Sequence, residues 1–359
     1  MEPKRVVVWG TGNVGRPAIR AILSHRDLEL VGVIVANPDK VGIDAGDIAG
    51  VASCGIIASD QSDDVLSLNP DVVVYTATAD IRPEQAMNDL LRCLRSGINV
   101  VSSAFYSFLD PISTSREITD VITSACRDTG ASLFVSGIDP GWAMDMLPIA
   151  VSGACADISE IRSREIFNYA LYDQPQVVRE VIGFGGSMED TPLMLHDFAI
   201  EMVWGPMLHI VGRAMGKAVE TVEVVVERLP LDATIDIPGM GVFEKGTQGA
   251  FRFEIKGMVG GRALYVVEHI TRIDDRCAPD WPYPPVGSGC HQLIISGSPT
   301  LELSVHGHDP VENGPAGGGN SSAAAWIVNA IPGVCDGMAG IVTLLDLPAI
   351  TGAAQMRSE

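Results

Sequence analysis

Apolar runs alternate with amphipathic stretches through about the first 140 residues of the chain. The runs predict strands at residues 5–9, 28–36, 55–58, 71–76, 99–102 and 132–136, because buried parallel strands read as nearly continuous hydrophobic segments. Apolar residues at helical spacing predict helices at 13–24, 83–96 and 114–128. Strands that alternate with helices are typical of a parallel sheet covered by helices. We therefore expect an α/β Rossmann domain over residues 1–148.

The pattern changes after Gly137. It predicts a helix at 143–151, a strand at 158–170 and a helical region over 174–216. Longer segments then predict strands at 219–228, 250–258, 263–273, 292–296 and 301–305. Strands grouped after a helical block indicate an α+β second domain with an open, mostly antiparallel sheet. We assign this domain to residues 149–320.

The end of the chain returns to helical spacing. Residues 317–320 are interpreted as a glycine-rich hinge, 321–331 as a helix, and 341–345 as its continuation after a break. We expect residues 321–359 to pack back on the first domain. The proline-rich segment 279–289 is expected to be a loop.

The first apolar run stops at Gly10 and opens a G-x-G-x-x-G pattern with Gly12 and Gly15. In such a turn the first glycine leaves the strand, the second lets backbone approach a pyrophosphate, and the third lets the helix pack on the strand. Free N–H groups at the helix N-terminus would hold the phosphates. The sequence therefore predicts a dinucleotide site that includes Gly10, Thr11, Gly12, Asn13, Val14, Gly15 and Arg16.

The residue after the second strand indicates which cofactor is used. NAD-selective sites place a carboxylate there for the ribose 2′-hydroxyl, but this chain has Asn37, with Lys40 close behind. Lys40 or Arg16 is a candidate to neutralise a 2′-phosphate. We therefore expect NADP to be preferred, while NAD stays open. The ends of the fourth and fifth strands should complete the site with Thr76, Ala77, Thr78, Ser102 and Ser103.

Composition and charge exclude several classes of protein. The 359 residues are 47% hydrophobic and carry a formal net charge of −21, which disfavours nucleic acid and anionic membranes as partners. No apolar run reaches the roughly 18 to 20 residues of a membrane helix, and the first residues lead into a strand instead of a signal peptide, so we expect a cytoplasmic protein. Seven cysteines without a C-x-x-C pair, and two histidines at 306 and 308 without further ligands, predict neither disulfides nor a metal site.

Four segments carry a family resemblance: residues 10–15, 31–42, 137–142 and 328–332. Together they resemble native amine dehydrogenases, which belong with 2,4-diaminopentanoate dehydrogenase and share a nucleotide domain with dihydrodipicolinate reductase. The resemblance implies NAD(P)-dependent reductive amination of a small ketone or aldehyde, or the reverse reaction, in a homodimer. It also adds Asn329 to the expected cofactor site.

Two positions depart from that family. The relatives place a glutamate just after the fifth strand, where it handles protons on the amine, whereas residues 103–107 here include Phe105 and no carboxylate. Asp139 stands where the family tends to have Asn. A ketone or aldehyde reductase without amination and a non-catalytic dinucleotide-binding sensor are therefore alternatives. We expect weak or no ammonia-dependent reduction from the unmodified protein.

Other side chains are candidates for the missing proton chemistry. Tyrosines can donate a proton to a carbonyl oxygen and histidine can shuttle one near neutral pH, so the catalytic candidates are Tyr106, Asp139, Tyr169, Tyr172 and His196. An apolar pocket for a hydrophobic small-molecule substrate is expected from Phe105, Trp142, Met144, Phe184, Met194 and Trp204. The open sheet face of the second domain should form the homodimer, because it would otherwise expose a large apolar patch.

Overall fold

The computed structural model describes residues 2–79, 82–172, 174–312 and 314–356. Within it the chain forms two compact units. The first consists of Met1–Trp142 together with Asn320–Glu359, and the second of Ala143–Gly319. None of the helices among the described residues is long and apolar enough to cross a membrane.

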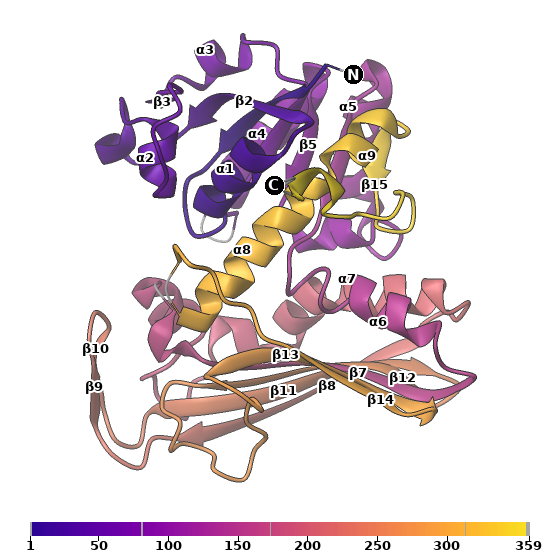
Figure 1. The fold of residues 1–359 in the computed structure, drawn as a ribbon. Helices are drawn as coiled ribbons and strands as arrows, with labels where there is room; N and C mark the ends of the chain where they lie inside the picture. Colours follow the sequence, from indigo (N-terminus) through magenta and orange to yellow (C-terminus); the bar gives the residue numbers. More distant parts are fainter. Residues whose placement is uncertain (1, 80–81, 173, 313, 357–359) are drawn as a thin grey trace. The chain divides into compact units, whose positions relative to one another are not determined.

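A parallel sheet forms the centre of the first unit (Figure 1). Its order is β15-β6-β5-β4-β1-β2-β3. The strands are β1 (Lys4–Trp9), β2 (Leu28–Ile34), β3 (Ala58–Ser59), β4 (Val72–Tyr75), β5 (Asn99–Ser102), β6 (Ser132–Val135) and β15 (Gly340–Val342). The strand order changes direction between β1 and β4, which is the position where doubly wound sheets bind ligands at the carboxyl ends of their strands.

Helices from both ends of the chain pack on this sheet. The first unit contains α1 (Gly15–Ser24), α2 (Ala45–Ala49), α3 (Ser62–Leu66), α4 (Pro83–Arg95), α5 (Arg116–Thr129), α9 (Ile331–Asp336) and residues 320–329 of α8 (Gly314–Asn329). Three short 3-10 turns join them: η1 (Pro38–Lys40), η2 (Tyr106–Leu109) and η6 (Ala353–Gln355). Ile19 of α1, Ile327 of α8 and Val334 of α9 share one buried core with Val6 and Val74 of the sheet.

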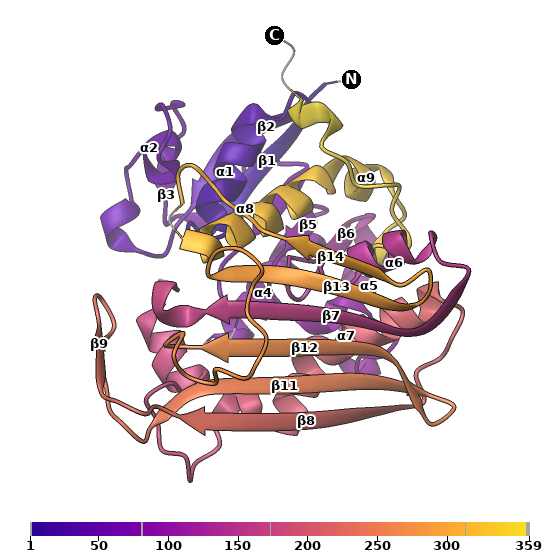
Figure 2. The same cartoon turned by 60° about the horizontal axis from the view of Figure 1, so that its bottom comes forward.

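A mixed sheet forms the second unit, in the order β14-β13-β7-β12-β11-β8 (Figure 2). The strands are β7 (Asp157–Asn168), β8 (Thr221–Pro230), β11 (Gln248–Val259), β12 (Arg262–Arg272), β13 (Gly289–Ser298) and β14 (Leu301–Val305). β7 and β12 run parallel, and the other neighbours are antiparallel. The predicted fold class, a Rossmann domain followed by a domain with an open, mostly antiparallel sheet, is confirmed.

One face of the second sheet is covered by helix. α7 (Asp197–Ala214) packs on β8, β11 and β12, and its Trp204 ring lies 4.8 Å from the Phe253 ring of β11. The remaining elements are α6 (Met146–Ser152), the hairpin β9 (Ile235–Ile237) and β10 (Gly241–Phe243), and three short helical turns, η3 (Tyr169–Leu171), η4 (Val177–Val181) and η5 (Leu193–Leu195). We call the side that faces α7 the inner face and the opposite side the outer face.

The outer face carries charge at its centre instead of the expected apolar surface. Glu268 is completely buried and accepts ion pairs from Arg162, Arg164 and Arg252 at 2.7 to 3.0 Å. Glu254 is paired with Arg162 at 2.6 Å. The homodimer was inferred from a large apolar patch on this open sheet face, and that premise is wrong at these charged positions. The homodimer itself stays a prediction, which light scattering at micromolar concentration can test.

Three element predictions were wrong. Residues 317–320 lie inside α8 and form no hinge; a Cβ on Gly318 would lie 2.2 Å from the carbonyl carbon of Gly307, so glycine is needed here for close packing and not for flexibility. Residues 341–345 are not helical, because β15 pairs with β6. The region 174–216 is not continuously helical, since irregular backbone separates η4, η5 and α7. In place of the strand predicted at 55–58, the structure has only the two-residue strand β3. The β9–β10 hairpin had not been predicted.

Glu254 provides a test of the outer-face ion pairs. Burial raises its pKa, but hydrogen bonds from Lys256 and Arg162 outweigh that effect and lower the pKa from 4.5 to about 2. A carboxyl group with a lowered folded-state pKa stabilises the protein above its unfolded pKa and loses that contribution as the pH falls. We expect Glu254→Gln to reduce the free energy of unfolding at pH 7 by about 1.5–3 kcal/mol, the usual contribution of hydrogen bonds to a charged group, and the difference from wild type to shrink between pH 4.5 and about 2.

Denaturant unfolding at pH 7 and pH 3 measures this difference. The exposed Glu302 of β14 supplies the control, because Glu302→Gln should change the free energy of unfolding by less than about 0.5 kcal/mol. A Glu254→Gln effect of equal size at both pH values would contradict the ion-pair explanation.

Candidate functional site

The glycine turn at the end of β1 has the geometry that the sequence predicts. Gly10 adopts φ +99°, and a Cβ there would lie 2.7 Å from the backbone nitrogen of Ala77. A Cβ on Gly15 would lie 2.1 Å from the Gly10 carbonyl oxygen, so the start of α1 can approach β1 only without a side chain. Gly12 differs, because a Cβ on it would meet nothing within 4 Å. The middle glycine therefore leaves open space beside the turn, as a bound pyrophosphate requires.

Hydrogen bonds fix this turn from two sides. The Thr76 hydroxyl, just after β4, donates to the Gly10 carbonyl oxygen at 2.9 Å. The Lys40 ammonium, at the end of η1, donates to the Thr11 carbonyl oxygen at 2.8 Å. Asn13 and Val14 complete the turn, and Val14 is the N-cap of α1. The predicted residues from Gly10 to Gly15, Lys40 and Thr76 thus lie together at the switch point of the sheet.

Two cations lie beside the turn. Burial lowers the pKa of the Lys40 ammonium, and the charge of Arg16 lowers it further. An anion bound near both side chains would relieve this repulsion. Asn37 lies next to them, and its side-chain oxygen accepts a hydrogen bond from the Asp39 backbone at 2.9 Å, which leaves its amide N–H groups for a ligand. The open glycine, the helix N-terminus and these cations fit a dinucleotide.

The remaining predicted cofactor residues follow neighbouring strands or end α8. Ala77 and Thr78 follow β4, and Thr78 is exposed. Ser102 is buried at the end of β5, where its hydroxyl oxygen accepts a hydrogen bond from the Ala104 backbone at 2.9 Å, and Ser103 is half-buried. Asn329 ends α8, and its side-chain oxygen is buried without a hydrogen-bond partner among the described residues. Their contact with a cofactor stays a prediction.

Phe105 occupies an unusual backbone conformation. Its φ is +64°, in the left-handed region that costs a side chain of this size about 1–2 kcal/mol. The ring lies 6.1 Å from that of Phe108, and half-buried Tyr106 begins η2 directly after it. Asp139 is half-buried in the loop after β6, and Trp142 of the same loop donates to the Ser322 hydroxyl at 3.3 Å. All of these residues belong to the first unit.

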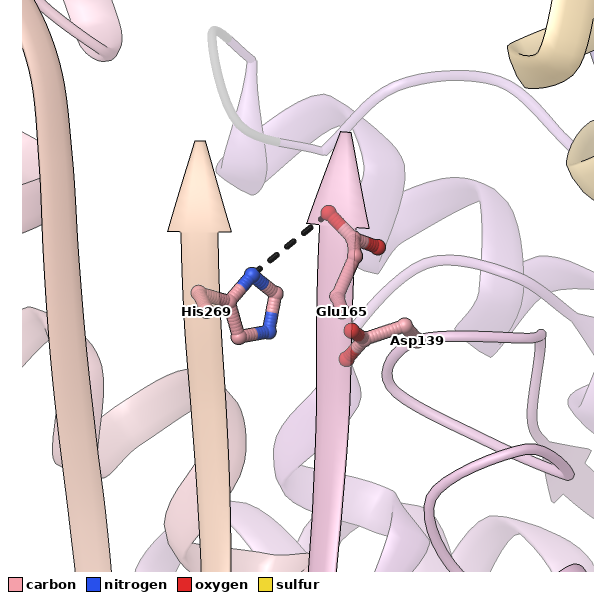
Figure 3. Close-up of side chains that lie close together, drawn as sticks. All are labelled: Asp139, Glu165 and His269. Carbon is pink, nitrogen blue, oxygen red and sulfur yellow. Dashed lines mark ion pairs between the residues drawn. The ribbon is translucent and has the colours of Figure 1, made fainter. Parts of the chain in front are cut away.

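A polar cluster lies on the inner face of the second sheet. Glu165 of β7 is directly opposite His269 of β12 and His291 of β13. One carboxylate oxygen lies 3.5 Å from His269 Nδ1 and accepts the Tyr169 hydroxyl at 3.1 Å. The other lies 3.3 Å from His291 Nε2. We call these four residues the Glu165 cluster; Figure 3 draws its Glu165–His269 pair together with Asp139 of the first unit.

Aromatic rings hold the cluster in place. The Phe253 ring stacks on His269 at 4.5 Å, and Trp204 meets the same imidazole edge-on at 4.8 Å. Tyr172 stacks on Tyr169 at 5.1 Å, and Phe184 lies 6.4 Å from Tyr169. Of the predicted residues, Tyr169 therefore belongs to this cluster, and the rings of Tyr172, Phe184 and Trp204 pack against its members.

The other candidates of the second unit lie elsewhere in it. His196 precedes α7 and is exposed; its ring stacks on Phe198 at 5.6 Å, beside a shallow hollow that Arg228 also lines. Met194 lies in η5, half-buried. Met144 is completely buried, and its carbonyl oxygen accepts the Tyr265 hydroxyl. The roles of these three residues stay predictions.

Sequence reasoning missed Glu165, His269 and His291. A signal was present, since the inward positions of β7 read Ile161, Ser163, Glu165 and Phe167, so that a carboxylate interrupts a buried alternation. Charged side chains are rarely buried without a partner. His269 falls within the strand predicted at 263–273, and His291 immediately precedes the strand predicted at 292–296. Their pairing with Glu165 depends on the order of the strands.

Comparisons with known proteins cover both units. Two family models match: "Dihydrodipicolinate reductase, N-terminus" over residues 4–104 and "2,4-diaminopentanoate dehydrogenase C-terminal domain" over residues 142–358. An amine dehydrogenase from Streptomyces virginiae is 44% identical over 95% of each chain. A 2,4-diaminopentanoate dehydrogenase from Acetoanaerobium sticklandii is 24% identical over 97% of this chain and 94% of its own. The solved amine dehydrogenase of Mycobacterium smegmatis has a TM-score of 0.74 at 22% identity, with 98% of each chain covered.

Gly12 and Gly15 give a matched pair of tests for the turn. We expect Gly12→Val to leave the melting temperature close to that of wild type, because its side chain enters open space, and to abolish dinucleotide binding. Gly15→Ala should instead lower the free energy of unfolding by about 1–3 kcal/mol or more, because its Cβ would collide with backbone. Fluorescence titration with NADPH and thermal unfolding measure the two effects. Normal cofactor affinity in a folded Gly12→Val protein would contradict the assignment.

Proposed function

Because this chain belongs to the family of 2,4-diaminopentanoate dehydrogenase and the amine dehydrogenases, we propose that it catalyses the NAD(P)-dependent reductive amination of a small hydrophobic ketone or aldehyde, or the reverse reaction. The protein is an NAD(P)-dependent oxidoreductase. The observation that carries the proposal is the turn from Gly10 to Gly15, in which a Cβ on Gly12 would meet nothing within 4 Å, so that the turn has room for a dinucleotide. A bound nicotinamide supplies the hydride of such a reaction.

The choice of cofactor is the second part of the proposal. The positive charges of Lys40 and Arg16 support NADP over NAD, since a 2′-phosphate would bring two negative charges to two mutually repelling cations. Asn37 supports the same choice, because it adds no negative charge at the end of β2. We also propose that the protein acts in the cytoplasm, because its seven cysteines are all free thiols, as a reducing compartment favours. Fractionation of the native cells tests that location.

Asn37→Asp tests the cofactor proposal. An aspartate can still cap η1 through its side-chain oxygen, so the fold should be retained. Its charge would repel a 2′-phosphate, and we expect NADPH binding to weaken by about 1–3 kcal/mol, with little effect on NADH. Asn37→Ser is the control, because serine caps the turn without adding charge. Tighter binding of NADH than of NADPH by wild type would contradict the proposal.

A reductase that does not use ammonia is a second candidate, and Phe105 favours it. At the position where the resemblance predicts a glutamate, this chain has an aromatic ring packed near Phe108. Under this candidate a ketone is reduced to an alcohol, and an acid group has only to protonate the oxygen.

Turnover with and without ammonium separates the two candidates. We propose to follow NADPH oxidation with cyclohexanone-like ketones, and the first candidate expects a cyclic amine as product only when ammonium is present. Under the second candidate wild type yields the alcohol, and Phe105→Glu should raise amination by roughly 10²- to 10⁴-fold, the usual effect of a positioned acid or base. Phe105→Gln is the matched control without a carboxylate. Robust amination by wild type would contradict the second candidate, in which Phe105 prevents the use of ammonia.

A further inference from the structure

We propose that Glu165 is the catalytic proton-transfer group of this enzyme. Tyr169, His269 and His291 hold its carboxylate in position and can exchange protons with it. This inference rests on the reductive amination proposed above. It assigns to β7, in the second unit, the chemistry that the family resemblance places after the fifth strand of the first.

The environment of Glu165 differs from that of the other buried glutamate in the same sheet. Glu268 lies on the outer face and contacts three arginines, and a guanidinium remains protonated at any ordinary pH. The Glu268 carboxylate therefore contacts only permanent cations among its ion-pair partners. Glu165, on the inner face, forms no ion pair with any lysine or arginine among the described residues; its ion-pair contacts are with His269 and His291.

The partners of Glu165 can all exchange protons. An imidazole gains or loses a proton near neutral pH, and a phenol hydroxyl both donates and accepts hydrogen bonds. Tyr169 contacts the same carboxylate oxygen as His269, and His291 lies against the other oxygen. A buried carboxylate with such partners can take up a proton and release it, because neither state leaves a permanent cation without its counter-charge.

Two buried hydroxyls without hydrogen-bond partners among the described residues lie on the same face as Glu165. Ser163 precedes it by two residues on β7, Thr271 follows His269 by two residues on β12, and both side chains are completely buried. Neither hydroxyl has a hydrogen-bond partner among the described residues. An unpaired buried polar atom costs about 1–3 kcal/mol. Two such hydroxyls on the face that carries Glu165, each two residues along its strand from a member of the cluster, indicate the place of a polar ligand or of water.

The proposed chemistry balances as follows. The nitrogen of ammonia forms a bond to the carbonyl carbon, and the π-electron pair of the C=O bond moves onto oxygen. Glu165 takes a proton from that nitrogen and returns it to the oxygen. The C–O bond then breaks, and the oxygen leaves as water with a second proton, which Glu165 relays from solvent. The nitrogen lone pair forms the C=N bond, whose carbon receives the hydride while the π pair returns to nitrogen.

Replacement of the carboxylate tests this role. Glu165→Gln keeps the size of the side chain and can still accept the Tyr169 hydroxyl, but it cannot exchange a proton at neutral pH. We expect kcat for ammonium-dependent NADPH oxidation to fall by roughly 10²- to 10⁴-fold. The Kd for NADPH should stay within about threefold of wild type, because the cofactor turn belongs to the first unit. In Glu165→Ala, added formate or acetate should restore part of kcat, which loss of a merely structural group would not allow.

Glu254→Gln is the matched control, since it removes one carboxylate from the outer face of the same sheet. Its kcat should stay within about threefold of wild type. If Glu165→Gln kept the kcat of wild type, the role assigned to Glu165 would be overturned, while the proposed function would stand. Absence of turnover by wild type with any ketone and either cofactor would overturn the proposed function, and this inference with it.

Discussion

The second unit depends on how its sheet satisfies buried charge on both faces at once. Successive residues of a strand point to opposite faces, and neighbouring positions of β7 and β12 use this rule. Arg164 and Glu268 pair on the outer face, while the next residue of each strand, Glu165 and His269, pairs on the inner face. A shift of one residue in register would bring an arginine onto the aromatic inner face and a glutamate among the outer charges. The ion pairs therefore help to specify the register of the central strands.

The fold could be predicted from the sequence wherever a segment carries its own periodicity. The bounds of β5 and β14 agree with the apolar runs, and the grouping of strands indicates the two fold classes correctly. Prediction failed where distant contacts decide the outcome. Residues 317–320 were interpreted as a hinge, but within α8 Gly318 closely approaches Gly307 and Gly317 closely approaches Glu312. β15 is too short to show alternation, and its pairing with β6 makes it a strand.

The same division applies to the candidate sites. The glycine turn is contiguous in sequence, so Gly10, Gly12 and Gly15 could be assigned roles before the structure was known, and the space around each one agrees with those roles. The Glu165 cluster is assembled by strand order, from a central strand and its two neighbours. Tyr169 was predicted for its phenol, but the carboxylate that it contacts could be identified only once β7 was known to lie between β12 and β13.

The first unit is built from both ends of the chain. β15 completes its sheet against β6, and the Lys4 ammonium near the N-terminus pairs with Asp336 of α9 at 2.9 Å. The second unit is one continuous stretch, Ala143–Gly319. Because a chain leaves the ribosome from its N-terminus, the second unit has all of its residues before the first has its last strand. During synthesis the nucleotide-binding sheet therefore stays incomplete, with the edge of β6 unpaired by β15, until nearly the whole protein has been made.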